Sequence, residues 1–403
     1  MAVKQGYKQT EVGVIPEDWE VKGFGEICKV NQGLQIAIEE RLKVPTVQSK
    51  IYITIQYLNS GKTVEYIDDY TTTVCCTEDD VLMTRTGNTG MVVTGVSGVF
   101  HNNFFKINFD RKQVDRRFLV EYLKIDKIRH IILVKAGTST IPDLNHSDFY
   151  SIPVILPPLY EQQAIAEALS DVDGLISALD ALIAKQRAIK QGAMQELLTG
   201  QRRLPGFAGE WEVKKLGEIA EISSGGTPDR KEDSYWNGTI PWITTSQIDS
   251  NRITAAEEFI TEIGLANSSA KKFNKNTLLM AMYGQGKTRG KVAILGIDAT
   301  INQACAAISI QQNISVEYIF FNLSQRYEEI RSLSNTGNQE NLNGNIIKAI
   351  PILLPPPAEQ TAIAQILADM DDAIAALVQK RAKTVALKQG MMQALLTGQV
   401  RLV

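Results

Sequence analysis

Two segments of the chain carry apolar residues at alternating steps of three and four positions. These residues are Ile165, Leu169, Val172, Ile176, Leu179 and Ile183 in the first segment, and Ile363, Leu367, Met370, Ile374 and Leu377 in the second. Such a heptad stripe is typical of a helix that packs lengthwise against another helix. Prolines precede each segment and a glycine follows it, at Gly200 and Gly398, so both ends of each helix are marked. We therefore predict two helices, Glu161–Leu198 and Glu359–Leu396, each of about 38 residues and about 57 Å.

Both helical segments belong to a sequence repeat. Residues 152–204 and 350–402 align without a gap, and roughly 30 of about 50 positions are identical, far above chance for so long a period. A second echo lies upstream, because Trp19-Glu20-Val21-Lys22 recurs as Trp211-Glu212-Val213-Lys214. A period of about 195 residues is too long for a solenoid unit and indicates two whole modules in tandem. Equal lengths favour antiparallel pairing of the helices within one chain, and a homodimeric coiled coil is the alternative.

The regions outside the helices follow a different pattern. Short apolar and β-branched runs at 81–83, 91–93, 278–280 and 291–295 alternate with glycine-rich turns and predict strands. We therefore assign the chain to the α+β class: two globular mixed α/β domains are separated by two long antiparallel coiled-coil helices, in a pseudo-twofold internal repeat. The predicted boundaries are 1–157 for the first domain, 158–204 for the central helix, 205–356 for the second domain and 357–403 for the distal helix.

One glycine-rich turn has two interpretations. Residues 281–288, AMYGQGKT, fit a relaxed phosphate-binding loop with alanine in place of the first glycine. Such a loop must lead into a helix, whose N-terminus binds the phosphate. Residues 289–295 instead contain glycine and β-branched residues and predict a strand. We therefore favour the tip of a β-hairpin, with a P-loop nucleotide-binding protein built on Lys287 and Thr288 as an alternative.

The predicted hairpin tips carry side chains that are able to read DNA bases. Arg and Lys bond guanine O6 and N7, Asn and Gln bond adenine, and Lys and Thr contact phosphate. A solvated polar turn is the simpler interpretation of the same residues. The candidate DNA-binding residues are Arg85, Thr86, Asn88 and Thr89 in the first domain, and Thr245, Gln247, Tyr283, Gln285, Lys287, Thr288 and Arg289 in the second.

Composition narrows the class of protein further. The 403 residues carry a net charge of −3, so any contact with DNA must come from locally arranged Lys and Arg. The four cysteines and three histidines match no zinc spacing, and no catalytic motif is found, so we expect no metal site and no catalytic activity. No apolar run is long enough to span a bilayer and the first ten residues are polar, so we expect a cytoplasmic protein.

The combination of motifs resembles the specificity subunits of type I restriction–modification enzymes, over the entire chain. The resemblance rests on Ile152-Pro153 through Pro157-Pro158, on Glu161-Gln162, and on the ending Lys190-Gln191-Gly192…Leu197-Leu198-Thr199-Gly200, each repeated between Ile350 and Gly398. The opening Ile15-Pro16-Glu17-Asp18-Trp19 and the run Ile240-Pro241-Trp242-Ile243 are also similar to the family. The combination is specific, whereas no single motif is.

The resemblance implies a division of labour. Two target-recognition domains, 1–157 and 205–356, each read one half of a split site in double-stranded DNA. The helix pair sets the gap between the halves and docks two methyltransferase (modification) subunits, and restriction/translocase subunits join them in host defence. S-adenosylmethionine, ATP and magnesium then belong to the partner subunits and not to this chain. A coiled-coil adaptor without a DNA role is the remaining alternative, and salt-dependent DNA binding by the complex separates the two.

Overall fold

The computed structural model describes residues 5–61, 64–137, 142–249, 251–284, 287–333 and 341–402. The chain divides into two compact units: unit 1 comprises the residues up to Asp180 together with those from Gln379 onward, and unit 2 comprises Ala181–Val378. Helices α6 (Leu159–Leu198) and α12 (Pro357–Leu396) are each 40 residues long, and each contributes one half to each unit. Both predicted helices are confirmed, with starts at Leu159 and Pro357 rather than Glu161 and Glu359.

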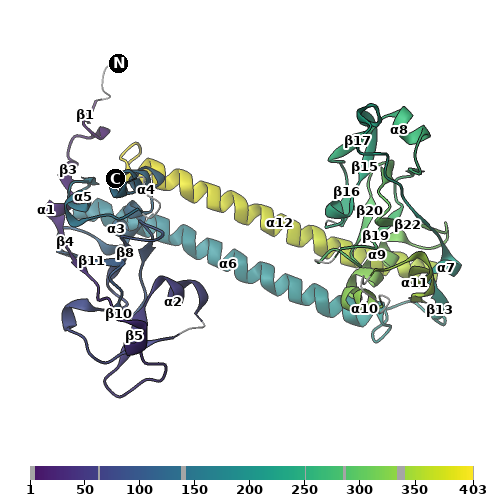
Figure 1. The fold of residues 1–403 in the computed structure, drawn as a ribbon, viewed down its shortest axis with the longest axis horizontal. Helices are drawn as coiled ribbons and strands as arrows, with labels where there is room; N and C mark the ends of the chain where they lie inside the picture. Colours follow the sequence, from purple (N-terminus) through teal and green to yellow (C-terminus); the bar gives the residue numbers. More distant parts are fainter. Residues whose placement is uncertain are drawn as a thin grey trace. The chain divides into compact units, whose positions relative to one another are not determined.

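Unit 1 contains two four-stranded sheets, ordered β6-β5-β10-β7 and β4-β11-β8-β9, and the strand pairs β1-β2 and β12-β3. Its strands are β1 (Tyr7–Thr10), β2 (Gly13–Pro16), β3 (Glu20–Gly23), β4 (Cys28–Gln32), β5 (Lys50–Ile53), β6 (Tyr66–Ile67), β7 (Cys75–Cys76), β8 (Val81–Thr84), β9 (Val92–Val93), β10 (Gly98–Phe100), β11 (Phe104–Phe109) and β12 (Pro153–Leu156). Its short helices are α1 (Phe24–Ile27), α2 (Ile55–Ser60), α3 (Arg116–Leu123), α4 (Asp126–Ala136) and α5 (His146–Tyr150). Within this unit α3 and α4 lie beside the ends of the long helices, and β5 and β10 lie farther away (Figure 1).

Unit 2 repeats this plan with a five-stranded sheet, β14-β22-β19-β20-β16, a four-stranded sheet, β17-β15-β21-β18, and the pair β13-β23. Its strands are β13 (Glu212–Lys215), β14 (Ala220–Ser224), β15 (Trp236–Ile243), β16 (Arg252–Ile253), β17 (Glu258–Ile260), β18 (Lys272–Phe273), β19 (Leu278–Ala281), β20 (Val292–Leu295), β21 (Ala299–Ile301), β22 (Cys305–Ile310) and β23 (Pro351–Leu354). Its short helices are α7 (Leu216–Ile219), α8 (Glu262–Ala266), α9 (Val316–Gln325), α10 (Tyr327–Ser332) and α11 (Gly344–Ala349). The predicted runs at 81–83, 91–93, 278–280 and 291–295 correspond to β8, β9, β19 and β20.

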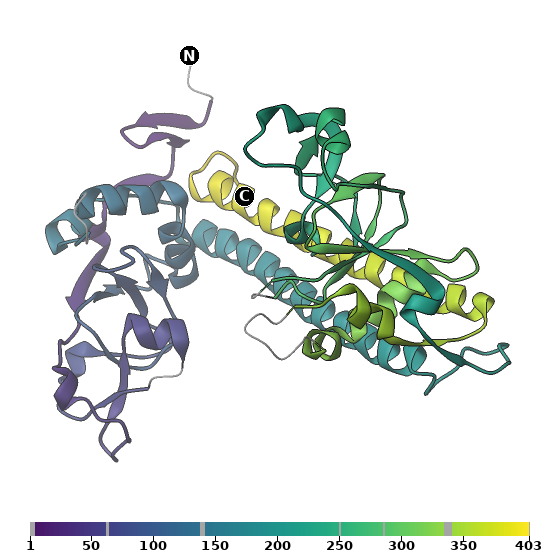
Figure 2. The same ribbon diagram turned by 45° about the vertical axis from the view of Figure 1, so that its right-hand side comes forward.

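Within each unit, half of α6 runs antiparallel to half of α12 (Figures 1 and 2). In unit 1, Lys388 of α12 pairs with Asp173 of α6 at 2.7 Å. In unit 2, Lys190 of α6 pairs with Asp371 of α12 at 2.5 Å. Lys190 and Lys388 occupy equivalent positions of the repeat, as do Asp173 and Asp371, so one ion pair forms twice. The helices therefore pair within one chain, as their equal lengths predicted.

Apolar residues of the long helices complete the core of each unit. In unit 1, Ile165 and Leu169 of α6 and Leu395 of α12 are buried in one cluster with the side chains of α3 and β12. In unit 2, Ile363 and Leu367 of α12 join the equivalent cluster with α9 and β23. The two units thus share one plan, in which each recognition module is packed against the start of its own helix and the end of the other. No helix among the described residues is long and apolar enough to cross a membrane.

A buried carboxylate stands at the start of each long helix. Glu161, fully buried, accepts a hydrogen bond from Trp19 Nε1 at 2.9 Å and an ion pair from Arg401 at 2.6 Å. Glu359 is also fully buried; it accepts a hydrogen bond from Trp211 Nε1 at 3.1 Å and forms an ion pair with Arg203 at 2.5 Å. We call each set a Trp–Glu–Arg clasp. Each clasp ties the start of one long helix to the residues that follow the other.

The predicted helix stops are confirmed at the same places. Gly200 and Gly398 both have φ 73°, the left-handed conformation that glycine adopts after the last turn of a helix. A Cβ atom at Gly398 would approach Pro16 to 2.5 Å, so close packing as well as φ excludes a larger residue there. The glycine therefore lets the chain turn sharply enough to bring Arg401 back to Glu161.

Candidate nucleic-acid interface

The first hairpin tip, residues 85–91, connects the antiparallel strands β8 and β9. Gly87 and Asn88 have φ of 63° and 54°, which reverses the chain and leaves the Asn88 side chain exposed. Thr89 is only 4 % exposed, and its hydroxyl donates to the Pro142 carbonyl at 2.9 Å. The structure therefore gives Thr89 a place inside the unit, and Asn88 is the predicted side chain most open to a ligand.

Arg85 and Thr86 share one acceptor at the base of this tip. Arg85 Nη2 donates to the Asp143 carboxylate at 2.7 Å, and the Thr86 hydroxyl donates to the same carboxylate. Arg85 Nε donates to the Leu144 carbonyl at 3.2 Å, and its guanidinium lies 5.5 Å from the centre of the Phe105 ring. The segment that precedes α5 thus holds the tip, a contact that no sequence pattern predicted.

The second tip connects β19 and β20, which pair antiparallel, so the predicted hairpin is confirmed. Tyr283 is 41 % exposed and Lys287 is exposed, whereas Thr288 is half-buried and Arg289 is only 5 % exposed. Gln285 lies outside the described residues. The strand β20 follows the loop where a phosphate-binding loop requires a helix. The segment therefore lacks the local structure that the P-loop alternative needs.

Thr245 and Gln247 form a short 3-10 turn after β15. Gln247 Nε2 donates to the Ala255 carbonyl at 3.1 Å. Thr245 is half-buried, and the hydroxyls of its neighbours Thr244 and Ser246 are hydrogen-bonded to each other at 2.6 Å. The Gln247 amide is thus used in part to hold the loop before β17. The structure does not join this turn to the tip at Tyr283 by any hydrogen bond among the described residues.

A second turn lies against each tip, and it carries amide side chains. Arg85 N donates to the Asn103 carbonyl at 2.7 Å, and Met282 N donates to the Ala304 carbonyl at 2.8 Å. Beside these bonds, Asn102 Nδ2 donates to Gln35 Oε1 at 2.7 Å in unit 1. Asn102-Asn103 and Asn302-Gln303 align in the sequence, but nothing there indicated that the amides gather next to the tips.

Three of the four cysteines, Cys28, Cys76 and Cys305, are buried. Burial raises the pKa of Cys28 and Cys305 to about 12 and that of Cys76 to about 11, so these thiols stay protonated. Burial, and to a lesser extent Arg41, lowers the pKa of His101. In the part of the chain that the structure describes, no group of three or more His, Cys, Asp or Glu is placed to hold a metal ion.

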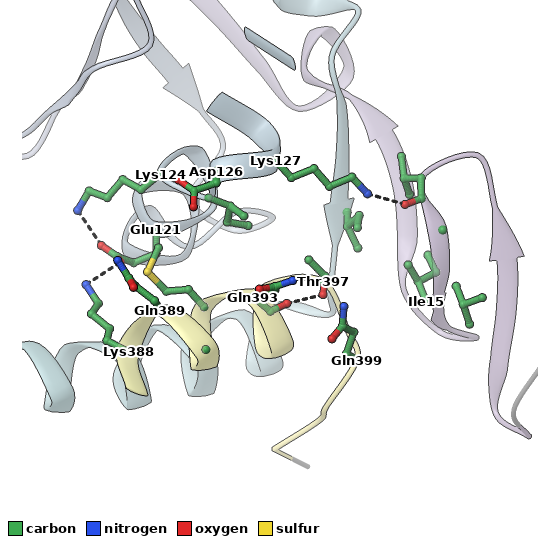
Figure 3. A pocket seen from close by; sticks show the side chains of 17 residues that line it. Ile15, Glu121, Lys124, Asp126, Lys127, Lys388, Gln389, Gln393, Thr397 and Gln399 are labelled. Atoms are coloured by element: carbon green, nitrogen blue, oxygen red, sulfur yellow. Dashed lines mark hydrogen bonds and ion pairs between the residues drawn. The ribbon is translucent and has the colours of Figure 1, made fainter. Parts of the chain in front are cut away.

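A groove of about 800 Å³ in unit 1 is lined by Lys124, Lys127 and Lys388, which makes it a candidate phosphate site. Its lysines are already engaged: Lys124 and Lys388 pair with Glu121 at 2.8 and 2.9 Å, and Lys127 donates to the Val12 carbonyl at 2.9 Å (Figure 3). Burial alone would lower the pKa of Lys388, but Asp173 and Glu121 outweigh it and the pKa is raised. The groove therefore offers internal ion pairs rather than a cationic cradle for phosphate.

Comparison with known proteins identifies the family. The model of the type I restriction modification DNA specificity domain matches residues 16–186 and again 208–386. The chain belongs to this family. This specificity subunit therefore carries two DNA specificity domains, one in each copy of its repeat. The repeated motifs and the two matches of the family model fall on the same two stretches of chain.

Relatives of this specificity subunit match all or part of its length. It is 25 % identical to the type I restriction enzyme MjaVIII specificity subunit of Methanocaldococcus jannaschii, over 99 % of this chain and 96 % of the relative. It is 30 % identical to the EcoR124I/EcoR124II specificity subunit of Escherichia coli, over 45 % of this chain and 46 % of that protein. The fold is similar to that of the S subunit from M. genitalium, with a TM-score of 0.58 and 16 % identity over 98 % of both chains.

These comparisons confirm the predicted family and the two-domain α+β architecture with long helices. A structure from a study of type I complex assembly is also similar, with a TM-score of 0.59 and 17 % identity over 96 % of this chain and 99 % of that one. They give no support to the adaptor or the P-loop alternative. The four predicted domain boundaries and the candidate DNA-binding residues remain predictions.

Proposed function

We propose that this specificity subunit reads a bipartite DNA site, with one half-site read by each unit, and performs no catalysis itself. The observation that carries the proposal is the duplication: two units with similar sheets, the same clasps and the same helix packing differ in their hairpin tips. A shared scaffold with different loops suits one task performed on two targets. Chemistry then belongs to partner subunits, and with them the S-adenosylmethionine, ATP and magnesium.

The tips supply the base-reading groups in this proposal. Asn88, Tyr283 and Lys287 are exposed, and Arg85 carries a guanidinium at the edge of its tip. Thr89 and Arg289 are buried, and the Thr89 hydroxyl also lies 3.2 Å from the Arg85 carbonyl of its own tip. The net charge of −3 provides no general attraction to phosphate, so the isolated chain binds DNA weakly and its partners supply much of the positive surface.

In this proposal the long helices set the gap between the two half-sites and dock the methyltransferase subunits. Each has 40 residues, and a helix of this length extends about 60 Å. On α6, Leu175, Leu182 and Ile189 follow each other at intervals of seven and are 45 %, 39 % and 46 % exposed. Apolar residues at this spacing on a helix surface indicate a further helix partner. We assign this stripe to a methyltransferase subunit.

A domain exchange tests the proposal. Residues 7–151 are replaced by the matching segment of another specificity subunit, the protein is assembled with its methyltransferase subunits in a bacterial host, and the methylated sites are mapped. One half-site should change, while the other half-site and the gap stay the same. A methylome in which both halves change together, or neither changes, rejects the assignment of one half-site to each unit. The assembled complex should also lose DNA affinity steeply as salt is raised.

A further inference from the structure

We propose that Asp143 positions Arg85 to read one base pair of the half-site that unit 1 recognises; this inference rests on the proposed function. The guanidinium is held from three directions. Nη2 donates to Asp143 at 2.7 Å, Nε donates to the Leu144 carbonyl at 3.2 Å, and the Phe105 ring lies beneath the group at 5.5 Å. Thr86 donates to the same carboxylate and fixes its orientation as well. Arg85 is therefore locked into one rotamer before any DNA arrives.

One edge of the guanidinium is left for a ligand. No described residue accepts a hydrogen bond from Arg85 Nη1, and the side chain is 16 % exposed. A guanidinium binds guanine by donating two parallel hydrogen bonds to O6 and N7 in the major groove. Because the orientation is already fixed, less side-chain entropy is lost when those two bonds form. The free edge thus matches the paired acceptors of a guanine.

The charge of the pair favours the same conclusion. The Asp143 side chain is 52 % exposed, so a carboxylate accompanies the guanidinium at the surface of the tip. The pair is close to neutral overall and adds little to the attraction of the DNA backbone, which depends on uncompensated Lys and Arg. A carboxylate at this position also repels a phosphate that approaches the arginine. These two effects leave base recognition as the role that the pair suits.

The repeat shows that the pair is particular to unit 1. Leu144 N donates to the Arg85 carbonyl at 2.9 Å, and in unit 2 Leu342 N donates to the Met282 carbonyl at 2.9 Å. This equivalence aligns Arg85 with Met282, and Asp143 with Asn341. Unit 2 keeps the backbone hydrogen bond but carries neither charge. Unit 2 thus keeps this backbone bond without the charged pair, and the pair is a feature of unit 1.

Three variants test this inference: Arg85→Met, Asp143→Asn and the double variant, which recreates the residues of unit 2. Each is assembled with the methyltransferase subunits, and binding is measured to DNA duplexes in which every position of both half-sites is replaced in turn. Arg85→Met and Asp143→Asn should both relax discrimination at the same position, by about tenfold or more. Asp143→Asn should add nothing in the Arg85→Met background, and Asp143→Glu should restore part of the preference. The half-site of unit 2 should keep its preferences throughout.

The control is a second arginine–carboxylate pair of matching geometry. Arg326 and Glu329 in unit 2 lie 2.6 Å apart, with side chains 20 % and 55 % exposed, against 2.7 Å, 16 % and 52 % for Arg85 and Asp143. Glu329→Gln should leave every base preference unchanged, which separates the loss of a surface ion pair from the loss of base reading.

The outcomes distinguish this inference from the proposed function. If Arg85→Met relaxes one position and Asp143→Asn does not, Asp143 has no positioning role, while the tip still reads DNA. If both variants weaken binding to all sequences equally, the pair serves phosphate contact or stability, and the inference is rejected. A domain exchange that alters no half-site would instead reject the proposed function itself.

Discussion

The clasp at Glu161 makes a quantitative prediction for the variant Arg401→Ala. The Glu161 carboxylate is fully buried and accepts bonds from Trp19 Nε1 at 2.9 Å and from Arg401 Nε and Nη2 at 3.0 and 2.6 Å. Without Arg401 the buried carboxylate keeps one neutral donor. Removing one partner of a buried ion pair costs about 3–5 kcal/mol, because the other charge is left uncompensated.

The exposure of Arg401 decides where in this range the variant lies. Its side chain is 26 % exposed, so water will solvate part of the space that it leaves and the lower limit applies. Arg401 also pairs with Asp18 at 2.9 Å, and that half-exposed pair adds no more than about 1 kcal/mol. We therefore expect Arg401→Ala to destabilise unit 1 by about 3 kcal/mol. Arg401→Lys keeps the charge but loses the paired geometry, and should cost about half as much.

Hydrogen exchange followed by mass spectrometry is the appropriate assay, because it reports the free energy of opening segment by segment. Peptides around Trp19 and Glu161 should lose protection in Arg401→Ala, and peptides around Trp211 should lose it in the equivalent variant Arg203→Ala. The control is Arg202→Ala, whose side chain is 74 % exposed and lies 3.4 Å from Glu196, and it should change stability by less than about 0.5 kcal/mol. If Arg401→Ala costs no more than this control, the buried carboxylate does not depend on its arginine and the reasoning is wrong.

Three further predictions follow from the helices and their contacts. Inserting seven residues into both long helices, after Asp180 and after Val378, preserves the heptad seam. Seven residues add about 10 Å, so the gap in the methylated site should lengthen by about three base pairs. An unchanged gap would count against the role of the helices in setting the gap. Leu182→Lys should weaken capture of a methyltransferase subunit in a pull-down by about tenfold or more, whereas Val44→Lys, at an exposed loop position of unit 1, should have no effect. Burial opposes ionisation of Glu121, but Lys124 and Lys388 outweigh it and hold its pKa below 4.5. A carboxyl group whose pKa is lowered in the folded state contributes its full stability above pH 4.5 and loses that contribution as the pH falls through the folded-state pKa. In Glu121→Gln, the urea concentration at the unfolding midpoint should therefore fall less steeply with decreasing pH than in the unchanged protein.

Periodicity was sufficient to predict the helices, because a heptad stripe between proline and glycine involves only local rules. All the predicted seam positions, from Ile165 to Ile183 and from Ile363 to Leu377, are buried or half-buried in the structure. Strands at the centre of each sheet, such as β8 and β19, were predictable for the same reason, since they are continuous apolar runs. The two-residue edge strands β6 and β16 were not predicted, because neither is part of a comparable apolar run.

The details of the candidate interface depend on contacts that sequence spacing does not encode. Thr89 and Arg289 were polar residues in predicted turns and so resembled Asn88 and Lys287, yet the structure buries them. The position of Thr89 depends on a segment 53 residues away, where the Pro142 carbonyl accepts its hydroxyl. The partner of Arg85 was missed for the same reason, because Asp143 lies 58 positions along the chain. Side-chain chemistry selected these loops as candidates, but only tertiary packing separates the residues that face outward from those that are buried.

The clasps also have a consequence for folding. Asp18 and Arg401 are in contact although 383 positions separate them, so unit 1 is closed only by the last residues of the second repeat. Unit 2, by contrast, is continuous from Ala181 to Val378 and contains both Arg203 and Glu359. During synthesis, therefore, all the residues of unit 2 are present as soon as its own segment has been made. The Glu161 carboxylate, by contrast, has no arginine partner until Arg401 has been synthesised. Because a long-range contact must offset a larger loop-closure entropy, the clasp of unit 1 should form last and open first, even though its atoms repeat those of unit 2.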